Sequence, residues 1–145
     1  MIYKDIIAKI KETLEKVDEI GSIYPYPIGK ETRPESYPFA MFFPDNIDNS
    51  FSDTASNRKT LTFQLYLTVN IANITTENVY TDVLPTLVDA VLREFDKDWD
   101  YGTSVAGYRT WCQVQNGNWG LVDSEAGLEA FANLTIQVDY SNSTN

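Results

Sequence analysis

The hydrophobic pattern at the start of the chain has the period of an amphipathic helix. Apolar residues recur at three- and four-residue intervals, at Ile2, Ile6, Ile10, Leu14 and Val17. Charged residues occupy the other faces, which is the arrangement of a helix with one buried side. Gly21 is a natural stop, so we predict an opening helix that ends before it.

A strict alternation follows later in the chain. From residue 60 the apolar side chains fall on one face, at Leu61, Phe63, Leu65, Leu67, Val69 and Ile71. The other face is uncharged and carries Thr60, Thr62, Gln64, Tyr66, Thr68 and Asn70. This alternation predicts a β-strand, about 40 Å long if fully extended. Its position in the sheet, at an edge or in the centre, stays open.

The remaining patterns predict one more helix and several further strands. Apolar spacing from Thr76 to Lys97 is helical, and Pro85 should kink this helix or begin its main part. A short strand near residue 23 and three longer strands are expected, the longer ones at 37–44, 108–115 and 128–140. Residues 45–57, "DNIDNSFSDTASN", are predicted as a long polar loop, and residues 116–127, "NGNWGLVDSEAG", as a turn region.

This order of elements predicts an α+β fold. The expected architecture is an antiparallel sheet of four to five strands with two helices packed on one face. At 145 residues the chain has the size of one domain, which we expect over residues 1–140. The polar residues 141–145, "SNSTN", are expected to form a disordered tail.

Composition argues against several classes of partner. The chain has 21 acidic and 11 basic residues, a formal net charge of −10, and so lacks the basic patch of a nucleic-acid binder. We expect no signal peptide and no membrane span, because no uncharged run is apolar enough for either. The single cysteine, Cys112, excludes an intrachain disulfide and favours a reducing cytosol, where it would be a small buried apolar residue.

The chain contains no histidine, which limits its possible chemistry. Serine or cysteine nucleophiles lack their usual general base, and histidine-containing metal sites cannot be built. The glycine loops that bind nucleotide phosphates do not occur. We therefore expect no enzyme activity, no catalytic residues, no cofactor and no bound metal.

Three aspartates at alternate positions, Asp96, Asp98 and Asp100, suggest the first half of a calcium loop. Such a loop also requires glycine at its sixth position and glutamate at its twelfth. Counted from Asp96, these positions hold Tyr101 and Gly107. The stretch is therefore predicted to be the acidic end of a helix that enters a loop.

The distribution of charge indicates an interaction surface. Residues 60–76, 110–122 and 130–138 carry no charge, and the charged residues concentrate on the predicted helices and loops. Two helices in so short a chain cover one face of a sheet, so we expect other subunits on the second face. Trp111 and Trp119 are expected mainly to pack. The residues expected at the interface are Ile47, Phe51, Thr62, Gln64, Tyr66, Thr68 and Trp119.

The order and patterning of these segments resemble the tail terminator, or tail completion, proteins of long-tailed bacteriophages. The resemblance covers essentially the whole chain, through the segments "IYKDIIAKIKETL", "YPYP", "SYPFAMFF", "RKTLTFQLYLTVNI", "LVDAVLREF" and "GLEAFANLTIQVDY". It implies a small α+β structural subunit of the virion tail, assembled in the host cytoplasm. Such subunits form a ring, commonly a hexamer, that caps the finished tail tube, ends its polymerisation and docks the head.

The partners implied by this resemblance are further copies of the chain, the tail tube protein and the head-tail connector proteins. DNA would pass through the ring without specific binding, and no membrane is involved. Two alternatives stay open. One is another neck or head-tail joining protein, and the other is a small calcium-dependent binding module built on Asp96, Asp98 and Asp100. The polar loop 45–57 departs from the family pattern and would be either a docking arm or an insertion.

Overall fold

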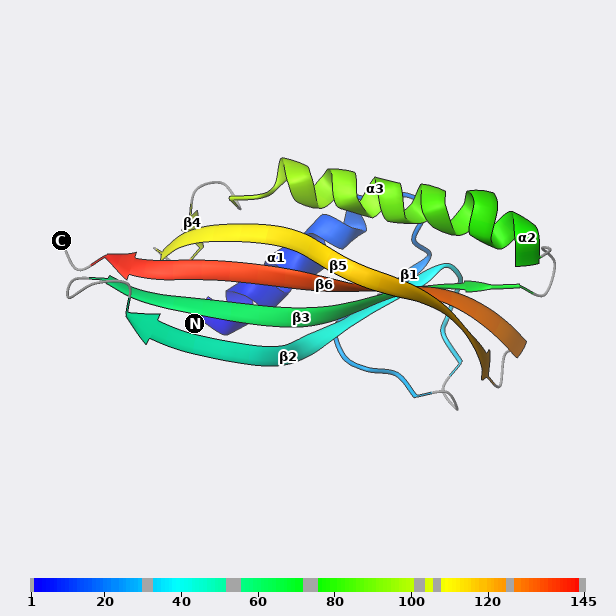
Figure 1. The fold of residues 1–145 in the computed structure, drawn as a ribbon, viewed down its shortest axis with the longest axis horizontal. Coiled ribbons are helices and arrows are strands. Elements are labelled where there is room, and N and C mark those ends of the chain that lie inside the picture. Colours follow the sequence, from blue (N-terminus) through cyan, green and yellow to red (C-terminus); the bar gives the residue numbers. More distant parts are fainter. Residues whose placement is uncertain are drawn as a thin grey trace.

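Long strands dominate the fold, which is shown in Figure 1. The computed structural model describes residues 2–29, 33–51, 56–71, 76–100, 104–105, 108–124 and 127–143. The strands are β1 (Ser22–Tyr24), β2 (Phe39–Phe51), β3 (Ser56–Asn70), β4 (Ser104–Val105), β5 (Tyr108–Ser124) and β6 (Gly127–Ser143). The helical segments are α1 (Ile2–Glu15), α2 (Thr76–Asn78), η1 (Val79–Val83) and α3 (Leu84–Lys97).

The six strands form one mixed sheet in the order β1-β2-β3-β6-β5-β4. The α+β class is confirmed, but the expected four to five antiparallel strands are corrected to six, with one parallel pair. Ser22 to Tyr24 of β1 run parallel to Phe39 to Met41 of β2, and the other strand pairs are antiparallel. A three-residue strand carries too few side chains for its pattern to reveal its direction.

One face of the sheet is buried by the helices. The alternating apolar residues of β3 and β6 face this layer, and Leu65, Leu67 and Ile136 are fully buried. Helix α1 contributes Ile6 and Ile10 to the same core, and α3 contributes residues from Leu84 to Phe95. In Figure 1, α1 passes behind the strands and α3 runs along the β5 side. The predicted two-helix layer is therefore confirmed.

The second helical stretch begins at Thr76 and ends at Lys97, as predicted, but it changes character on the way. Residues 79–83 form a π-helix, and the Leu84 N–H bonds the carbonyl of Val79 five residues earlier. Pro85 lies at the start of α3, directly after the π-helical residues, and has no N–H to donate to the preceding turn. Of the two roles predicted for Pro85, it therefore takes the second.

The long polar loop predicted at 45–57 is wrong where the structure describes it. Strand β2 continues to Phe51 and β3 begins at Ser56, so these residues extend a hairpin whose ladder includes Ile47 with Leu61. The register shifts between Pro44 and Asn46, which makes Asp45 the extra residue of a bulge. Cross-strand pairing along a long ladder has overridden the weak strand propensity of Asp and Asn. Residues 52–55 lie outside the described part.

The turn predicted at 116–127 is also shorter than expected. Strand β5 runs through this segment to Ser124 and pairs with β6, with a register shift between Val114 and Gly117. The reversal itself includes Gly127, which has φ of 108° and so a backbone conformation that favours glycine. At the other end, β6 includes Ser141 to Ser143, which were expected in the tail. The division into one domain and a tail otherwise stays a prediction.

Candidate interaction face and groove

Strand β3 is a central strand, which settles the question that the sequence left open. It pairs with β2 on one side and with β6 on the other. Its polar side chains therefore do not line a free edge but point away from the helices. We call this side of the sheet the open face, and it carries Met41, Phe43, Gln113, Asn133, Thr135, Gln137, Thr62, Gln64 and Tyr66.

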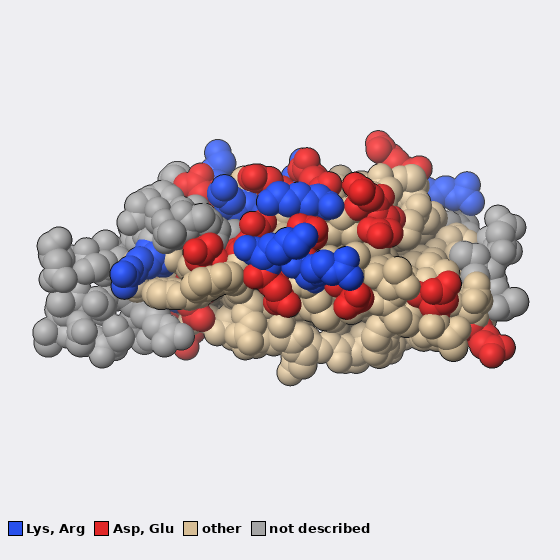
Figure 2. All heavy atoms as spheres, turned by 90° about the horizontal axis from the view of Figure 1, so that it is seen from above, with Lys and Arg blue, Asp and Glu red and all other residues tan. Residues whose placement is uncertain are grey.

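The middle of the open face is almost free of charge. Thr62 pairs with Gln137, Gln64 with Thr135 and Tyr66 with Asn133, and all six side chains are neutral. Asp45, in the β2 bulge, accepts a hydrogen bond from Gln64 Nε2 at 2.9 Å. On the side of the molecule that Figure 2 shows, by contrast, acidic and basic residues gather over the helices. Covering the open face therefore removes few charges from water, which lowers the cost of an interface there.

Aromatic rings cross the open face from β2 to β6. The rings of Phe43 and Tyr66 stack with centroids 6.1 Å apart and an interplanar angle of 16°. The ring of Tyr66 also contacts that of Phe131, with centroids 5.7 Å apart. These rings are only partly buried. They supply a rigid apolar surface of the kind that is enriched at protein interfaces.

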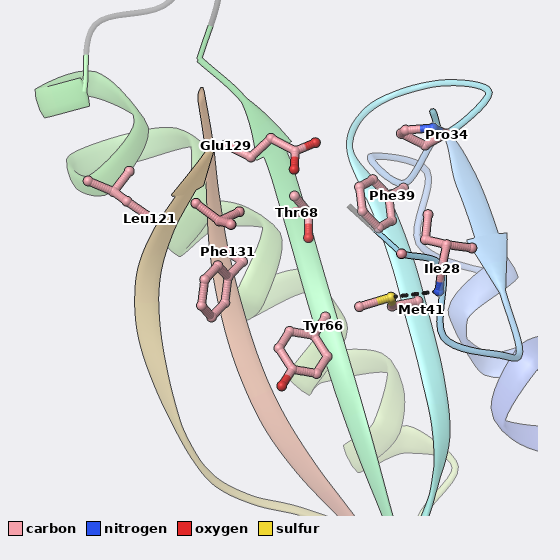
Figure 3. Close-up of a pocket in the computed structure, with 11 residues that line it drawn as sticks. Ile28, Pro34, Phe39, Met41, Tyr66, Thr68, Leu121, Glu129 and Phe131 are labelled. Carbon is pink, nitrogen blue, oxygen red and sulfur yellow. Dashed lines mark hydrogen bonds between the residues drawn. The ribbon is translucent and has the colours of Figure 1, made fainter. Parts of the chain in front are cut away.

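A groove of about 460 Å³ lies at the end of this aromatic surface. Its floor comes from β2, β3 and β6, and includes Phe39, Met41, Tyr66, Thr68, Glu129 and Phe131. One wall is formed by Ile28, Gly29 and Pro34, which lie between β1 and β2, and the other by Leu121 and Val122 of β5. Figure 3 shows the two walls on opposite sides of the floor.

The wall between β1 and β2 is fixed by hydrogen bonds at several points. The Ile28 N–H of this wall donates to Met41 Sδ of β2 at 3.4 Å (Figure 3). The Glu35 N–H donates to the Tyr24 hydroxyl at 2.8 Å, and Ser22 Oγ donates to the Ser36 carbonyl at 2.8 Å. These bonds hold the described parts of this wall in place within the subunit.

Glu129 is the most unusual residue of the groove because its side chain is charged and only 6% exposed. The Tyr37 hydroxyl donates a hydrogen bond to Glu129 Oε2. The pKa of Tyr37 is raised to about 12, mainly by burial and further by the hydrogen bond to Glu129 and the negative charge of that residue. Arg33 and the hydrogen bond to Asn70 oppose it. Among the described residues, Glu129 has no ion-pair partner.

The structure gathers some of the residues predicted for the interface and separates others. Thr62, Gln64 and Tyr66 lie together on the open face, while Thr68 is only 4% exposed on the groove floor. Ile47 is 54% exposed but pairs with Leu61, so it lies on the helix side of the sheet. The Phe51 side chain is outside the described part.

The two tryptophans singled out from the sequence do not pack in the core. Trp111 is 41% exposed and Trp119 is 51% exposed, so the packing prediction is wrong for both. Trp119 pairs with Ala132, on the helix side of the sheet. It therefore does not join the residues of the open face. Cys112, in contrast, is buried as predicted, with 5% exposure.

The groove was not predicted as a site, because its residues come from separate strands and a turn-rich segment. One local signal pointed to it. Glu129 is the only charged residue between Leu128 and Val138, so a carboxylate interrupts an otherwise uncharged strand. Its hydrogen-bond donor, Tyr37, is 92 residues away in sequence. Sequence pattern alone does not bring such residues together.

The aspartate triplet belongs to the junction of the two helices. Asp98 caps α3, and its Oδ2 accepts a bond from Lys16 Nζ at 2.8 Å. The Thr13 hydroxyl lies 3.2 Å from the same oxygen and 2.9 Å from the Lys9 carbonyl, and its one proton serves either acceptor. Within the described ranges, no three acidic or cysteine side chains gather as a metal site. The α1–α3 contact therefore accounts for Asp98.

Comparison with known proteins gives a fold relation. No known family and no curated protein matches this chain. Among solved structures, it is similar to a chain described as "Virion of native gene transfer agent (GTA) particle", with a TM-score of 0.61. The match covers 97% of this chain and 98% of that one, at 9% sequence identity. The two chains thus share a fold from end to end.

Among the described helices, none combines the length and apolarity needed to cross a membrane.

Proposed function

We propose that this chain is a structural virion protein that assembles into a ring, ends the growth of a phage tail tube and provides the surface that docks the head. The observation that carries the proposal is the end-to-end fold likeness to a chain of a phage-like virion particle. The order of segments along the sequence, which resembles the tail terminator proteins, supports the more specific role. Ring size is part of this proposal, with a hexamer expected.

The surface of the molecule supports assembly in physical terms. One face of the sheet is covered by this chain's own helices, whereas the open face presents neutral polar side chains and partly exposed rings. A net charge of −10 disfavours binding to DNA phosphates and is compatible with DNA passing through a ring. We therefore propose further copies of the chain, the tail tube protein and the head-tail connector proteins as its partners.

The second candidate function is another neck or head-tail joining protein, since the fold likeness does not distinguish positions within a virion. A calcium-dependent binding module is not favoured, because Asp98 is engaged by Lys16 and Thr13. An enzymatic role gains no support from the groove, because its described lining residues include one carboxylate and no nucleophile paired with a base.

Negative-stain microscopy of the purified chain, alone and mixed with tail tubes, tests this proposal. Rings seated at one end of each tube are the expected result. If the subunit does not bind tail tubes but binds heads that carry a portal, the second candidate function, a neck or head-tail joining protein, is supported instead. A monomer that binds neither would contradict a structural role in the virion.

A further inference from the structure

The described lining of the groove on the open face is mostly apolar and includes one charged side chain. Aromatic and aliphatic side chains provide most of its surface, among them Phe39, Met41 and Phe131. Among the described residues that line it, Glu129 is the only charged one. The groove therefore combines a large apolar area with a single carboxylate at a defined place.

The carboxylate of Glu129 is poorly compensated by the described part of the subunit. Its side chain is almost buried, and it receives one hydrogen bond, from the Tyr37 hydroxyl. A buried carboxylate without an ion-pair partner loses hydration that a single neutral donor does not replace. Arg33, on the segment that forms the wall, is exposed and forms no ion pair with Glu129. A cationic side chain of a partner protein would compensate the lost hydration of the Glu129 carboxylate.

The aromatic floor of the groove favours the same kind of ligand. Tyr66 on β3 and Phe131 on β6, two residues after Glu129, lie in contact, with ring centroids 5.7 Å apart. An ammonium or guanidinium group over such ring faces gains electrostatic attraction that adds to a carboxylate contact. The methylene groups of a lysine or arginine would lie against Met41 and Phe39.

We propose that the groove binds an extended segment of a partner protein that inserts one lysine or arginine, flanked by apolar residues, toward Glu129. The occupant is a protein segment because the groove continues directly into the open face through Tyr66, so a protein that covers this face also reaches the groove. The inference rests on the proposed use of the open face in assembly. It adds the chemistry by which the partner is recognised.

A matched pair of peptides tests the charge requirement in the free subunit. The probes are acetyl-Phe-Lys-Phe-amide and the same peptide with norleucine in place of lysine, titrated into ¹⁵N-labelled protein and followed by NMR. Shifts should concentrate on residues of the groove, such as Thr68, Val122 and Phe131. The lysine peptide should bind at least about tenfold more tightly, because only it can pair with the carboxylate.

Two variants of the protein separate the groove from the rest of the face. Glu129→Gln keeps an acceptor for the Tyr37 hydroxyl and should reduce the preference for lysine to less than about twofold. Asp45→Asn removes a carboxylate from the same face outside the groove and should leave the preference unchanged. The amide spectrum of each variant confirms that it is folded.

Three results would overturn the inference: equal binding of the two peptides, shifts outside the groove, or no binding of either peptide at millimolar concentration. Any of these can occur while rings still form on tail tubes, in which case the proposed function stands and the groove inference alone fails. If the peptides behave as expected but no ring or tube complex forms, the groove is a binding site and the proposed function fails.

Discussion

At the scale of single residues, the pair Tyr37 and Glu129 has the clearest energetic consequence. It joins the segment that precedes β2 to β6 through a hydrogen bond in a largely buried setting. Removing the donor leaves a buried carboxylate without its described partner, and such a loss costs about 1–3 kcal/mol. The sequence alone gave no reason to connect the two residues.

Tyr37→Phe should therefore lower the free energy of unfolding at neutral pH by about 1–3 kcal/mol. The pKa of Tyr37 is raised to about 12 in the folded chain, against an ordinary value of 10.0. The protonated tyrosine thus contributes its full stability below pH 10, and the contribution disappears as the pH rises through about 12.

Urea unfolding of the wild type and Tyr37→Phe from pH 7 to pH 12 measures this contribution. The difference between the two should shrink above pH 10, because only the wild type must ionise Tyr37 as it approaches pH 12. Tyr26→Phe serves as the control, since Tyr26 is 54% exposed. A difference that is constant across the range would contradict the assigned cause.

At the scale of elements, the long hairpins β2–β3 and β5–β6 each contain a register shift, and the backbones of β5 and β6 approach each other closely. An added Cβ at Gly117 would lie 2.1 Å from the Asn133 carbonyl oxygen, so β5 and β6 approach closely there. This glycine directly follows the register shift of β5. A side chain at this position cannot be accommodated without moving backbone, since the contact is a main-chain oxygen.

Gly117→Ala should lower the free energy of unfolding by about 1–3 kcal/mol, the usual cost of overpacking. Gly29→Ala provides the matched control, because nothing lies within 4 Å of the Cβ that it would add. Thermal unfolding of both variants measures the comparison. If the two variants melt at the same temperature, the close approach of β5 and β6 is wrong.

The contact between α1 and α3 gives a second prediction at this scale. Asp98→Asn weakens the interaction with Lys16 and Thr13 and should cost about 0.5–1 kcal/mol, since both charged groups are partly exposed. Asp89→Asn removes an acid that is paired with Arg93 on the same helix, 72% exposed, and should cost less.

The same melts test the calcium alternative. If Asp98 serves the helix contact, millimolar Ca²⁺ and a chelator should leave the melting temperature of the wild type unchanged. A rise in melting temperature that requires calcium and is lost in Asp98→Asn would instead support the alternative of a calcium-dependent binding module.

At the scale of the whole molecule, the two sides of the sheet differ in kind. Acidic and basic residues gather over the helices (Figure 2). The middle of the open face, in contrast, pairs neutral side chains, and aromatic rings cross this face from β2 to β6. Placing a charge in the middle of a face that is buried in an assembly is costly, because the charge loses water and gains no partner.

Thr135→Glu places such a charge on the open face, while Thr86→Glu makes the same change on the exposed side of α3. The first should weaken ring or tube association by about tenfold or more, and the second should have less than about a twofold effect. Cosedimentation with tail tubes measures both, after thermal melts show that each variant folds. Equal association of the two variants would exclude the open face from the contact.

The helices and the buried face of the central strands could be predicted because their signals are local. Ile6, Ile10 and Leu14 repeat with the helical period, and Leu61, Leu65 and Leu67 with that of a strand. The strand segments next to the hairpin turns, at the end of β2 and the end of β5, could not be predicted in this way. Asp, Asn and Gly are weak strand formers, and only their ladder partners hold residues 45–51 and 116–124 in the sheet.

The sequence by itself determined which apolar side chains of the two helices and of the central strands are buried, because helical and strand periodicities are set by residues a few positions apart. It also determined the neutrality of the strands and the acidity of the chain as a whole. Only the tertiary structure decided that β3 is central, that β1 is parallel to β2, and that Glu129 meets Tyr37 in an apolar groove. These features depend on pairing between residues far apart in sequence, for which local periodicity contains no information.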